Sequence, residues 1–249
     1  MSKRKVIYAL IALLACLQFS GANLGAAAEP EAGNPKKIEE AGNSQKVEKE
    51  PPQEDIYFEK KSQTFINGEL AGPEKLLAVW LKGDRIRFES EENKDQFTLI
   101  LMDKGKTYEL NKLQKTYKEA SSEMDKLKQI NERTMITSRR TGEKKKIKDW
   151  NCYEVQMDTT IQGNKMKATC WLTEEIHISS KAIEKMAKFS KMKMMEELAK
   201  YPGYPVQVIM DSNLQGKQVR VVSTLTKITK GPIKSEFFQI PFEYAKISP

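Results

Sequence analysis

The chain has 249 residues, of which 39% are hydrophobic and 31% charged, and its 42 basic and 34 acidic side chains give a formal charge of +8. This length allows one or two domains with a core large enough to fold unaided, and the mean hydropathy of −0.61 predicts a polar, unfolded stretch somewhere in the chain. His177 is the single histidine, which excludes metal sites built from several histidines and makes any Ser-His-Asp or Cys-His mechanism depend on that residue.

The N-terminal segment has the features of a secretory leader. Residues 1–5 include three basic side chains, the apolar run at residues 6–19 follows, and small residues come next. This order is typical of a signal peptide, and the apolar run is shorter than the about 20 residues of a membrane-spanning helix. We therefore expect residues 1–28 to be a signal peptide and the protein to be exported.

Two processing routes fit the leader, and the sequence leaves both open. Signal peptidase I could cleave after Ala28 or Ala22, each of which follows small residues. Alternatively, Leu13-Leu-Ala-Cys16 is similar to a bacterial lipobox, and Cys16 would then carry a lipid. The expected location is the periplasm of a Gram-negative-type bacterium, either free or anchored to the outer membrane. Lipidated Cys16 would be the only contact with a membrane.

A polar linker is expected between the leader and the folded part. Residues 29–54 contain only Ile38 and Val47 as large apolar side chains, too few to offset the conformational entropy lost on folding. This composition predicts a disordered linker at residues 29–54 and a domain at residues 55–249. The exported chain would have a charge of about +5, because the leader removes three basic residues. In an exported protein this favours anionic envelope surfaces over nucleic acid, since no aromatic residues are interleaved with the lysines.

From residue 55 onward, apolar segments alternate with short turns. Four antiparallel hairpins are expected, with strands at residues 75–81 and 85–90, 96–103 and 107–110, 153–161 and 165–172, and 206–212 and 217–229. Each turn contains a glycine, which takes positive φ without steric cost. The basic segment at residues 139–146 predicts a solvated hairpin tip, with contact to anionic lipid as the alternative.

Some of these strands are apolar on both faces. In the strand at residues 96–103, Phe97, Leu99 and Leu101 alternate with Ile100 and Met102. One face must then meet a helix or loop, and the other must line a core or a cavity. Two stretches with helical spacing are expected to cover the sheet, at residues 121–133 and 179–201. The predicted fold class is mainly β (α+β), a curled antiparallel sheet or half-barrel with one or two covering helices.

Several segments resemble a known family. They are residues 78–89 (AVWLKGDRIRFE), the pattern at residues 99–117 that ends in Lys-Thr-Tyr, residues 141–155, and residues 229–241. These are similar to the bacterial envelope domain of unknown function DUF4412. That family is similar in architecture to the periplasmic lipoprotein carriers, in which an antiparallel sheet curls over a hydrophobic cavity. The resemblance implies a lipoprotein-carrier-like fold, and it brings no active site with it.

Cys152 and Cys170 are the only cysteines in residues 55–249. In an oxidising compartment, a disulfide between them is the default expectation. However, if Gly163-Asn164 is a two-residue turn, Met157 pairs with Cys170 and Cys152 lies on the opposite face of the hairpin. A one-residue bulge would bring the two thiols to one face again. The sequence therefore does not decide whether Cys152 and Cys170 form a disulfide.

The methionine-rich stretch at residues 179–201 supplies the candidate contact residues. With Ile183 at the centre of the inner face of a helix, Met194 and Leu198 lie on that face. Met186 and Tyr201 lie on it as well. Three large apolar side chains lie off this face: Phe189, Met192 and Met195. Either neighbouring loops bury them, or they form a surface for an apolar ligand or a partner. A metal site is not expected, because Met194 faces away from the other two methionines.

Two functions fit these features. The first is an exported, non-enzymatic envelope protein that binds a lipid or other apolar ligand in a half-barrel cavity, without a cofactor. The alternative is an envelope interaction protein that docks a protein partner and has a packed interior. A hydrolase is not expected, because the sequence offers no nucleophile with a matching base.

Overall fold

The structure is a computed structural model, and it describes residues 55–120, 134–161, 164–176, 178, 193–214 and 216–247. Nearly all of this part of the chain is extended. The strands are β1 (Ile56–Ile66), β2 (Glu69–Leu70), β3 (Lys75–Lys82), β4 (Arg85–Ser90), β5 (Gln96–Leu101), β6 (Lys106–Asn111), β7 (Thr116–Glu119), β8 (Thr134–Ile147), β9 (Trp150–Ile161), β10 (Asn164–Thr173), β11 (Tyr204–Leu214), β12 (Lys217–Lys230) and β13 (Ala245–Lys246). The helical segments are α4 (Lys193–Leu198) and the 3-10 helices η2 (Glu91–Asn93), η3 (Met102–Lys104) and η4 (Ser235–Phe238).

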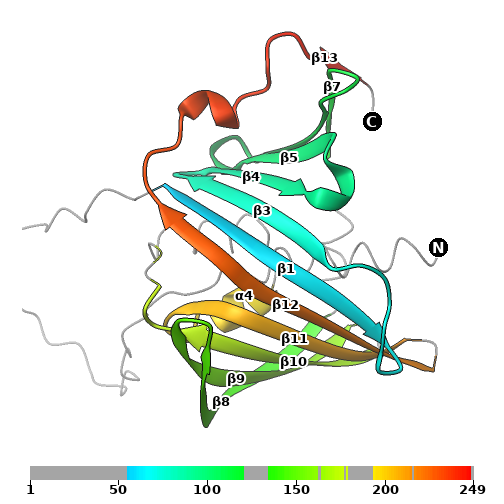
Figure 1. Cartoon of the computed structure of the whole chain (residues 1–249), viewed down its shortest axis with the longest axis vertical. Coiled ribbons are helices and arrows are strands. Elements are labelled where there is room, and N and C mark those ends of the chain that lie inside the picture. Colours follow the sequence, from blue (N-terminus) through cyan, green and yellow to red (C-terminus); the bar gives the residue numbers. More distant parts are fainter. Residues whose placement is uncertain are drawn as a thin grey trace, which may run out of the picture.

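All the strands belong to one open, curled sheet. Its order is β13-β7-β6-β5-β4-β3-β1-β12-β11-β10-β9-β8, with β2 paired to β1. Neighbouring strands are antiparallel, except that β13 runs parallel to β7. The long strands β1 and β12 cross the middle of the molecule, and the two halves of the sheet twist away on either side of them (Figure 1). The prediction of a mainly β, curled antiparallel sheet is confirmed.

The four predicted hairpins are all present. Gly83 and Gly105 have φ of +54° and +63° in the first two turns, as the predicted use of glycine requires. The third hairpin differs in register, because Ile161 pairs with Asn164 and Cys170 pairs with Val155. The predicted pairs were therefore displaced by two positions. A displacement of two keeps every side chain on its face, so the predicted separation of the faces holds.

The basic segment at residues 139–146 is not a hairpin tip. It lies within β8, and the turn follows at residues 148–149, where Lys148 takes a φ of +52°. β8 is the last strand of the sheet order, and its register shifts between Arg140 and Lys144. Lysine-rich, irregular edge strands resist pairing with another chain, which accounts for this composition in a strand.

Two clusters of buried side chains form most of the core and lie mainly on the inner face, the face that carries Phe58 and Val79. Cys152 and Trp171 are exceptions, because they lie on the other face of β9 and β10. The first, called the central cluster, consists of Ile56, Phe58, Val79, Leu81, Ile86, Cys152, Trp171, Ile176, Ile178, Met195, Tyr204, Val206 and Leu225. The second, called the distal cluster, consists of Tyr153, Val155, Met157, Met166, Ala168, Cys170, Leu172, Met194, Leu198, Val208, Met210 and Val221. Together they follow the sheet from β4 to β9.

A third cluster explains the strands that are apolar on both faces. The outer cluster consists of Phe97, Leu99, Leu101, Leu110 and Phe238, and the C-terminal segment around η4 supplies Phe238 to it. On the other face of β5, Ile100 packs against the central cluster. The sheet is therefore buried on both sides at β5, as its sequence predicts, and a short 3-10 helix provides the outer cover.

Helical cover is only partly seen. α4 packs against β8 and lies behind the sheet in Figure 1. Residues 121–133 and 179–192 lie outside the described part of the chain. Within α4, Met194 and Leu198 are 3% and 0% exposed, which agrees with the predicted inner stripe. Among the described residues, no helix is both long and apolar enough to cross a membrane.

Candidate functional site

The most unusual side chain of the interior is Lys60, which is only 2% exposed. It lies on β1, where Ile56, Phe58 and Lys60 alternate with outward-facing residues. At this point the pairing of β1 with β12 shifts register between Glu59 and Lys60. Such bulges are found where a strand redirects a side chain next to a functional site. A charged residue is thereby held on a face whose buried side chains are mostly apolar.

Two aromatic rings flank the Lys60 ammonium. Its Nζ lies 5.2 Å from the centroid of the Phe58 ring and 4.9 Å from that of the Tyr204 ring, within the range of cation–π attraction. Burial lowers the pKa of Lys60 well below its ordinary value, since a charge in an apolar interior loses its hydration. The rings favour the charged form of the amine, whereas burial favours the neutral form.

Tyr204 supplies a second polar group at this position. The side chain is 0% exposed, and its Oη has no hydrogen-bond partner among the described residues. Burial raises the pKa of the phenol well above its ordinary value, so this oxygen keeps its proton. A buried hydroxyl without an acceptor costs free energy, which makes Tyr204 a hydrogen-bond donor available to another group.

The start of β11 fixes the position of Tyr204. The preceding residue, Gly203, has a φ of +98°, and a Cβ placed there would lie 2.2 Å from the carbonyl oxygen of Thr173. No side chain fits at such a distance, so only glycine allows the backbone to pass the end of β10 this closely. This approach brings Tyr204 into the central cluster beside Phe58, with ring centroids 6.0 Å apart.

Met195 belongs to the same cluster and is buried, which was one of the two alternatives that the sequence left open for this side chain. It is 1% exposed and packs in the central cluster, whereas Met194 and Leu198 pack in the distal cluster. α4 is therefore buried on two sides, because it sits where the two clusters meet. We define the Lys60 site as Phe58, Lys60, Met195 and Tyr204. The other candidate contact residues, Phe189 and Met192, lie outside the described residues, as do Cys16 and His177.

The candidate disulfide is absent. Cys152 and Cys170 are free and buried. Cys170 pairs with Val155, and Cys152 is three positions from Val155, so the two thiols lie on opposite faces of the sheet. Burial, with the Glu175 carboxylate adding to it, raises the pKa of Cys152 to about 11, and burial raises the pKa of Cys170 to about 12. Both thiols are therefore in their unreactive, protonated form.

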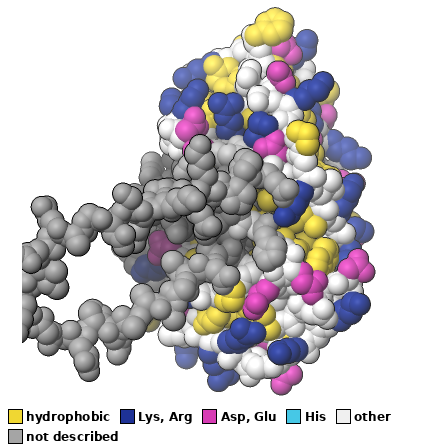
Figure 2. All heavy atoms as spheres, turned by 90° about the vertical axis from the view of Figure 1, so that its left-hand side faces the viewer, with side chains coloured by type: hydrophobic (Ala, Val, Ile, Leu, Met, Phe, Trp, Pro, Cys, Tyr) yellow, Lys and Arg dark blue, Asp and Glu magenta, His cyan; other side chains and the backbone are white. Residues whose placement is uncertain are grey.

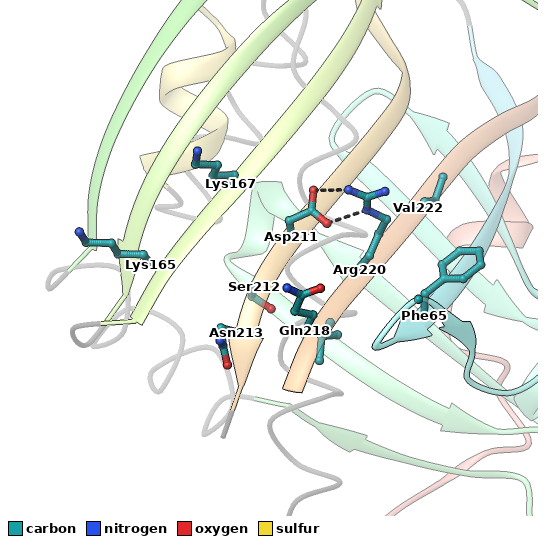
Figure 3. A pocket seen from close by; sticks show the side chains of 11 residues that line it. Phe65, Lys165, Lys167, Asp211, Ser212, Asn213, Gln218, Arg220 and Val222 are labelled. Atoms are coloured by element: carbon teal, nitrogen blue, oxygen red, sulfur yellow. Dashed lines mark hydrogen bonds and ion pairs between the residues drawn. The ribbon is translucent and has the colours of Figure 1, made fainter. Parts of the chain in front are cut away.

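A groove of about 740 Å³ lies on the other side of the sheet, across β10, β11, β12 and the end of β1. Phe65 and Val222 form its apolar part, and Lys165 and Lys167 lie along one side (Figure 3). Arg220 is paired with Asp211 through Nε–Oδ1 at 2.6 Å and Nη2–Oδ2 at 3.1 Å. Because this arginine is neutralised and the lysines are exposed, the groove resembles an ordinary solvated sheet face.

The basic segment of β8 has part of its charge engaged with aromatic rings. The Arg140 guanidinium lies 3.7 Å from the centroid of the Tyr153 ring, and Lys145 Nζ lies 3.9 Å from that of Trp171. Over the described surface visible in Figure 2, Lys and Arg side chains are spread out, with apolar side chains between them. Within the described ranges, no group of three or more His, Cys, Asp or Glu residues could hold a metal ion.

Comparison with known proteins identifies one family. The domain of unknown function DUF4412 matches residues 72–244, and no curated protein matches the chain. Among solved structures, PNGF-II is 12% identical with a TM-score of 0.39 and covers 78% of this chain and 32% of its own, so the chain spans about a third of that protein.

Two further solved structures are of similar size to this chain. A DUF1329 family protein from Desulfovibrio piger is 7% identical, with a TM-score of 0.33 and coverage of 76% of this chain and 90% of that one. An outer membrane lipoprotein-sorting protein domain from Vibrio parahaemolyticus is 8% identical, with a TM-score of 0.32 and coverage of 74% and 88%.

Proposed function

The chain belongs to the DUF4412 family, and we propose that it is an exported, non-enzymatic envelope protein that binds a lipid or other apolar ligand at the inner face of its sheet. The observation that carries the proposal is the Lys60 site. Here a buried lysine and a buried tyrosine hydroxyl lie among apolar side chains. The leader at residues 1–28 supports export.

The energetics of Lys60 favour a functional role over a purely structural one. Removing an ammonium from water costs several kcal/mol. Phe58 and Val79, at the neighbouring positions of the same face, are apolar, and such side chains carry no desolvation cost of this kind. Buried groups with strongly shifted pKa values are enriched at functional sites.

The composition of the surroundings suits an apolar ligand. Small-molecule sites are mostly lined by aromatic and aliphatic side chains, with a few polar groups that orient the ligand. The Lys60 site has this combination, and Met195 adds a flexible side chain that can adapt to different apolar shapes. Methionine and aromatic rings would contact the chain of a lipid, and the two polar groups would set its orientation.

The alternative function, docking of a protein partner, is supported by a different observation. Phe242 is fully exposed and Leu113 is 75% exposed, although isolated apolar side chains are common on protein surfaces. In this alternative the inner face is packed only to stabilise the fold, and Lys60 serves no ligand.

Native mass spectrometry of the gently purified protein tests the proposal. We expect an adduct with the mass of a lipid, and we expect the protein stripped of this adduct to bind hexadecanol. Phe58→Leu should weaken hexadecanol binding several-fold, whereas the matched control Phe65→Leu, on the outer groove of the same strand, should leave it unchanged. A protein that carries no adduct and does not bind hexadecanol would favour the docking alternative.

A further inference from the structure

We propose that two neighbouring turns at one end of the sheet insert an exposed leucine and an exposed phenylalanine into the surface of an anionic phospholipid bilayer. The turns, called the paired turns, are residues 112–115, between β6 and β7, and residues 241–244, before β13. This inference goes beyond the proposed function, because it concerns a membrane contact beside β7 and β13, whereas the Lys60 site lies on β1 in the middle of the sheet.

The paired turns lie side by side because β7 and β13 are neighbouring parallel strands at the top of Figure 1. Thr116, the first residue of β7, pairs with Ala245, the first residue of β13. Leu113 and Phe242 each lie three positions before these residues, so they occupy equivalent places at the same end of the two strands. The Ala245 amide also donates a hydrogen bond of 2.9 Å to the Lys115 carbonyl, which joins the two turns directly.

The side chains of Leu113 and Phe242 project from positions where polar residues are usual. Phe242 is fully exposed and Leu113 is 75% exposed, although turns are normally built from Gly, Pro, Asn, Asp and Ser. The same C-terminal segment buries Phe238 in the outer cluster and packs Tyr244 against it. Phe242 is therefore left outside the core by a segment that places its other aromatic side chains inside.

Hydrogen bonds within each turn hold these side chains in place. The Tyr244 amide donates to the Pro241 carbonyl at 3.0 Å, which closes the second turn around Phe242. In the first turn, the Gln114 amide donates to Asn111 Oδ1 at 2.9 Å. A turn that is already fixed loses little conformational entropy on binding, so both apolar side chains are presented ready for insertion.

Basic side chains beside the paired turns favour an anionic surface. Lys115 and Lys246 are exposed, and neither forms an ion pair with another described residue. Lys112 is engaged with Glu89 at 2.8 Å, and Glu243 is the one acidic residue within the turns. Two unpaired lysines against one glutamate leave a positive balance, and each lysine close to an anionic membrane adds to the attraction.

A bilayer fits this surface better than a protein partner does. A stable protein interface buries about 800 Å² on each partner, whereas one fully buried aromatic side chain contributes only about 150–250 Å². Two projecting side chains therefore supply a fraction of the area that a protein partner needs. A membrane requires no complementary shape, and binding to it increases with inserted apolar area and with attraction to anionic lipids.

Vesicle flotation tests the inference. The mature chain that begins at residue 29, which lacks Cys16, is mixed with vesicles of phosphatidylglycerol and phosphatidylethanolamine in equal parts, or with vesicles of phosphatidylcholine alone. We expect the wild type to bind the anionic vesicles at least about ten-fold more tightly than the neutral ones, because two lysines lie close to the charged surface.

Variants assign the binding to the paired turns. Phe242→Ser and Leu113→Ser should each weaken binding to the anionic vesicles about ten-fold, because each removes an inserted apolar side chain. Lys115→Gln should weaken it about five-fold. The matched control is Met135→Ser, which removes a side chain that is 70% exposed on β8, at the opposite end of the sheet order. This control should bind as the wild type does.

A fluorophore on the turn reports insertion separately from affinity. The environment-sensitive probe NBD, attached to Phe242→Cys, should shift its emission to the blue when anionic vesicles are added, because the probe leaves water. The same probe attached to Met135→Cys should show no shift. Cys152 and Cys170 are buried in the folded protein, so the added thiol takes the label.

The inference is wrong if the wild type floats with neither kind of vesicle, if it binds both kinds equally, or if the two serine variants bind as tightly as the wild type. Absence of vesicle binding, together with a crosslink to an envelope protein that depends on Phe242, would favour docking of a protein partner instead. Hexadecanol binding at the inner face tests the proposed function separately, so a failure of one leaves the other standing.

Discussion

Phe238→Ala would test the role of the C-terminal segment as the outer cover of the sheet. Phe238 is 1% exposed and packs with Phe97, Leu99, Leu101 and Leu110 in the outer cluster. Removal of a buried phenyl ring from such a position costs about 3–5 kcal/mol, which combines the lost transfer free energy and the cavity left behind. For a domain of this size, that loss lowers the melting temperature by roughly 6–20 °C.

The matched control is Phe242→Ala, four residues further along. The Phe242 side chain is fully exposed, so its removal should change the free energy of unfolding by less than about 0.5 kcal/mol. Urea unfolding followed by tryptophan fluorescence, analysed with a common m-value, measures both variants. If Phe238→Ala is no more destabilising than Phe242→Ala, the C-terminal segment does not cover the sheet as described.

Two other predictions concern the interior. Gly203→Ala should lower the free energy of unfolding by roughly 3 kcal/mol or more, because the new Cβ clashes with Thr173 and the backbone has a positive φ. The matched control Gly216→Ala also has a positive φ but no atom within 4 Å of the new Cβ, so it should cost only about 1–2 kcal/mol. Equal losses for the two variants in urea unfolding would contradict this difference. Neither buried cysteine should react with a thiol label in the native protein near pH 8. The reason is that the pKa of Cys152 is raised to about 11 and that of Cys170 to about 12, so the reactive thiolate forms only as the pH approaches these values. Rapid labelling of the native protein would contradict the burial of the thiols, and a mass two hydrogens lighter than that of the reduced protein would contradict their unpaired state.

The hairpins could be predicted because their signals are local. Turns such as the one at Gly83 stand between two strands in sequence, and the turn residue and the alternation lie within one short window. The predicted register of β9 and β10 was wrong by two positions, because the residue pairs 162–163 and 163–164 both contain Gly163 and could each form the turn in sequence terms. The basic segment was misassigned because a charged run fits a solvated tip and an edge strand equally well, and the order of strands decides between them.

The Lys60 site was missed, although part of its signal is present in the sequence. The alternation Ile56, Phe58, Lys60 places the lysine on the same face as two large apolar side chains. What the alternation does not reveal is that β1 occupies the middle of the sheet, or that Tyr204 of β11 lies beside it. These contacts depend on the pairing of β1 with β12, in which Lys60 lies opposite Leu225, 165 residues further along the chain.

Met195 shows a different limit of sequence patterns. A helical wheel assumes that one stripe faces one partner, and Met194 and Leu198 satisfy that assumption. Met195 lies off the stripe but is buried, because α4 contacts two clusters at once. The exposure of a helical side chain therefore depends on how many neighbouring elements pack against the helix. The periodicity of the helix sequence does not give that number.

Photo-crosslinking with a palmitate that carries a diazirine on its chain tests the central claim most directly. The adducts on the mature protein are mapped by peptide mass spectrometry, with unlabelled palmitate as competitor. The proposed function predicts saturable labelling of inner-face side chains around the Lys60 site, with adducts on Phe58, Met195 or Tyr204. Adducts confined to the outer groove at Phe65 and Val222, or labelling that palmitate does not displace, would contradict it.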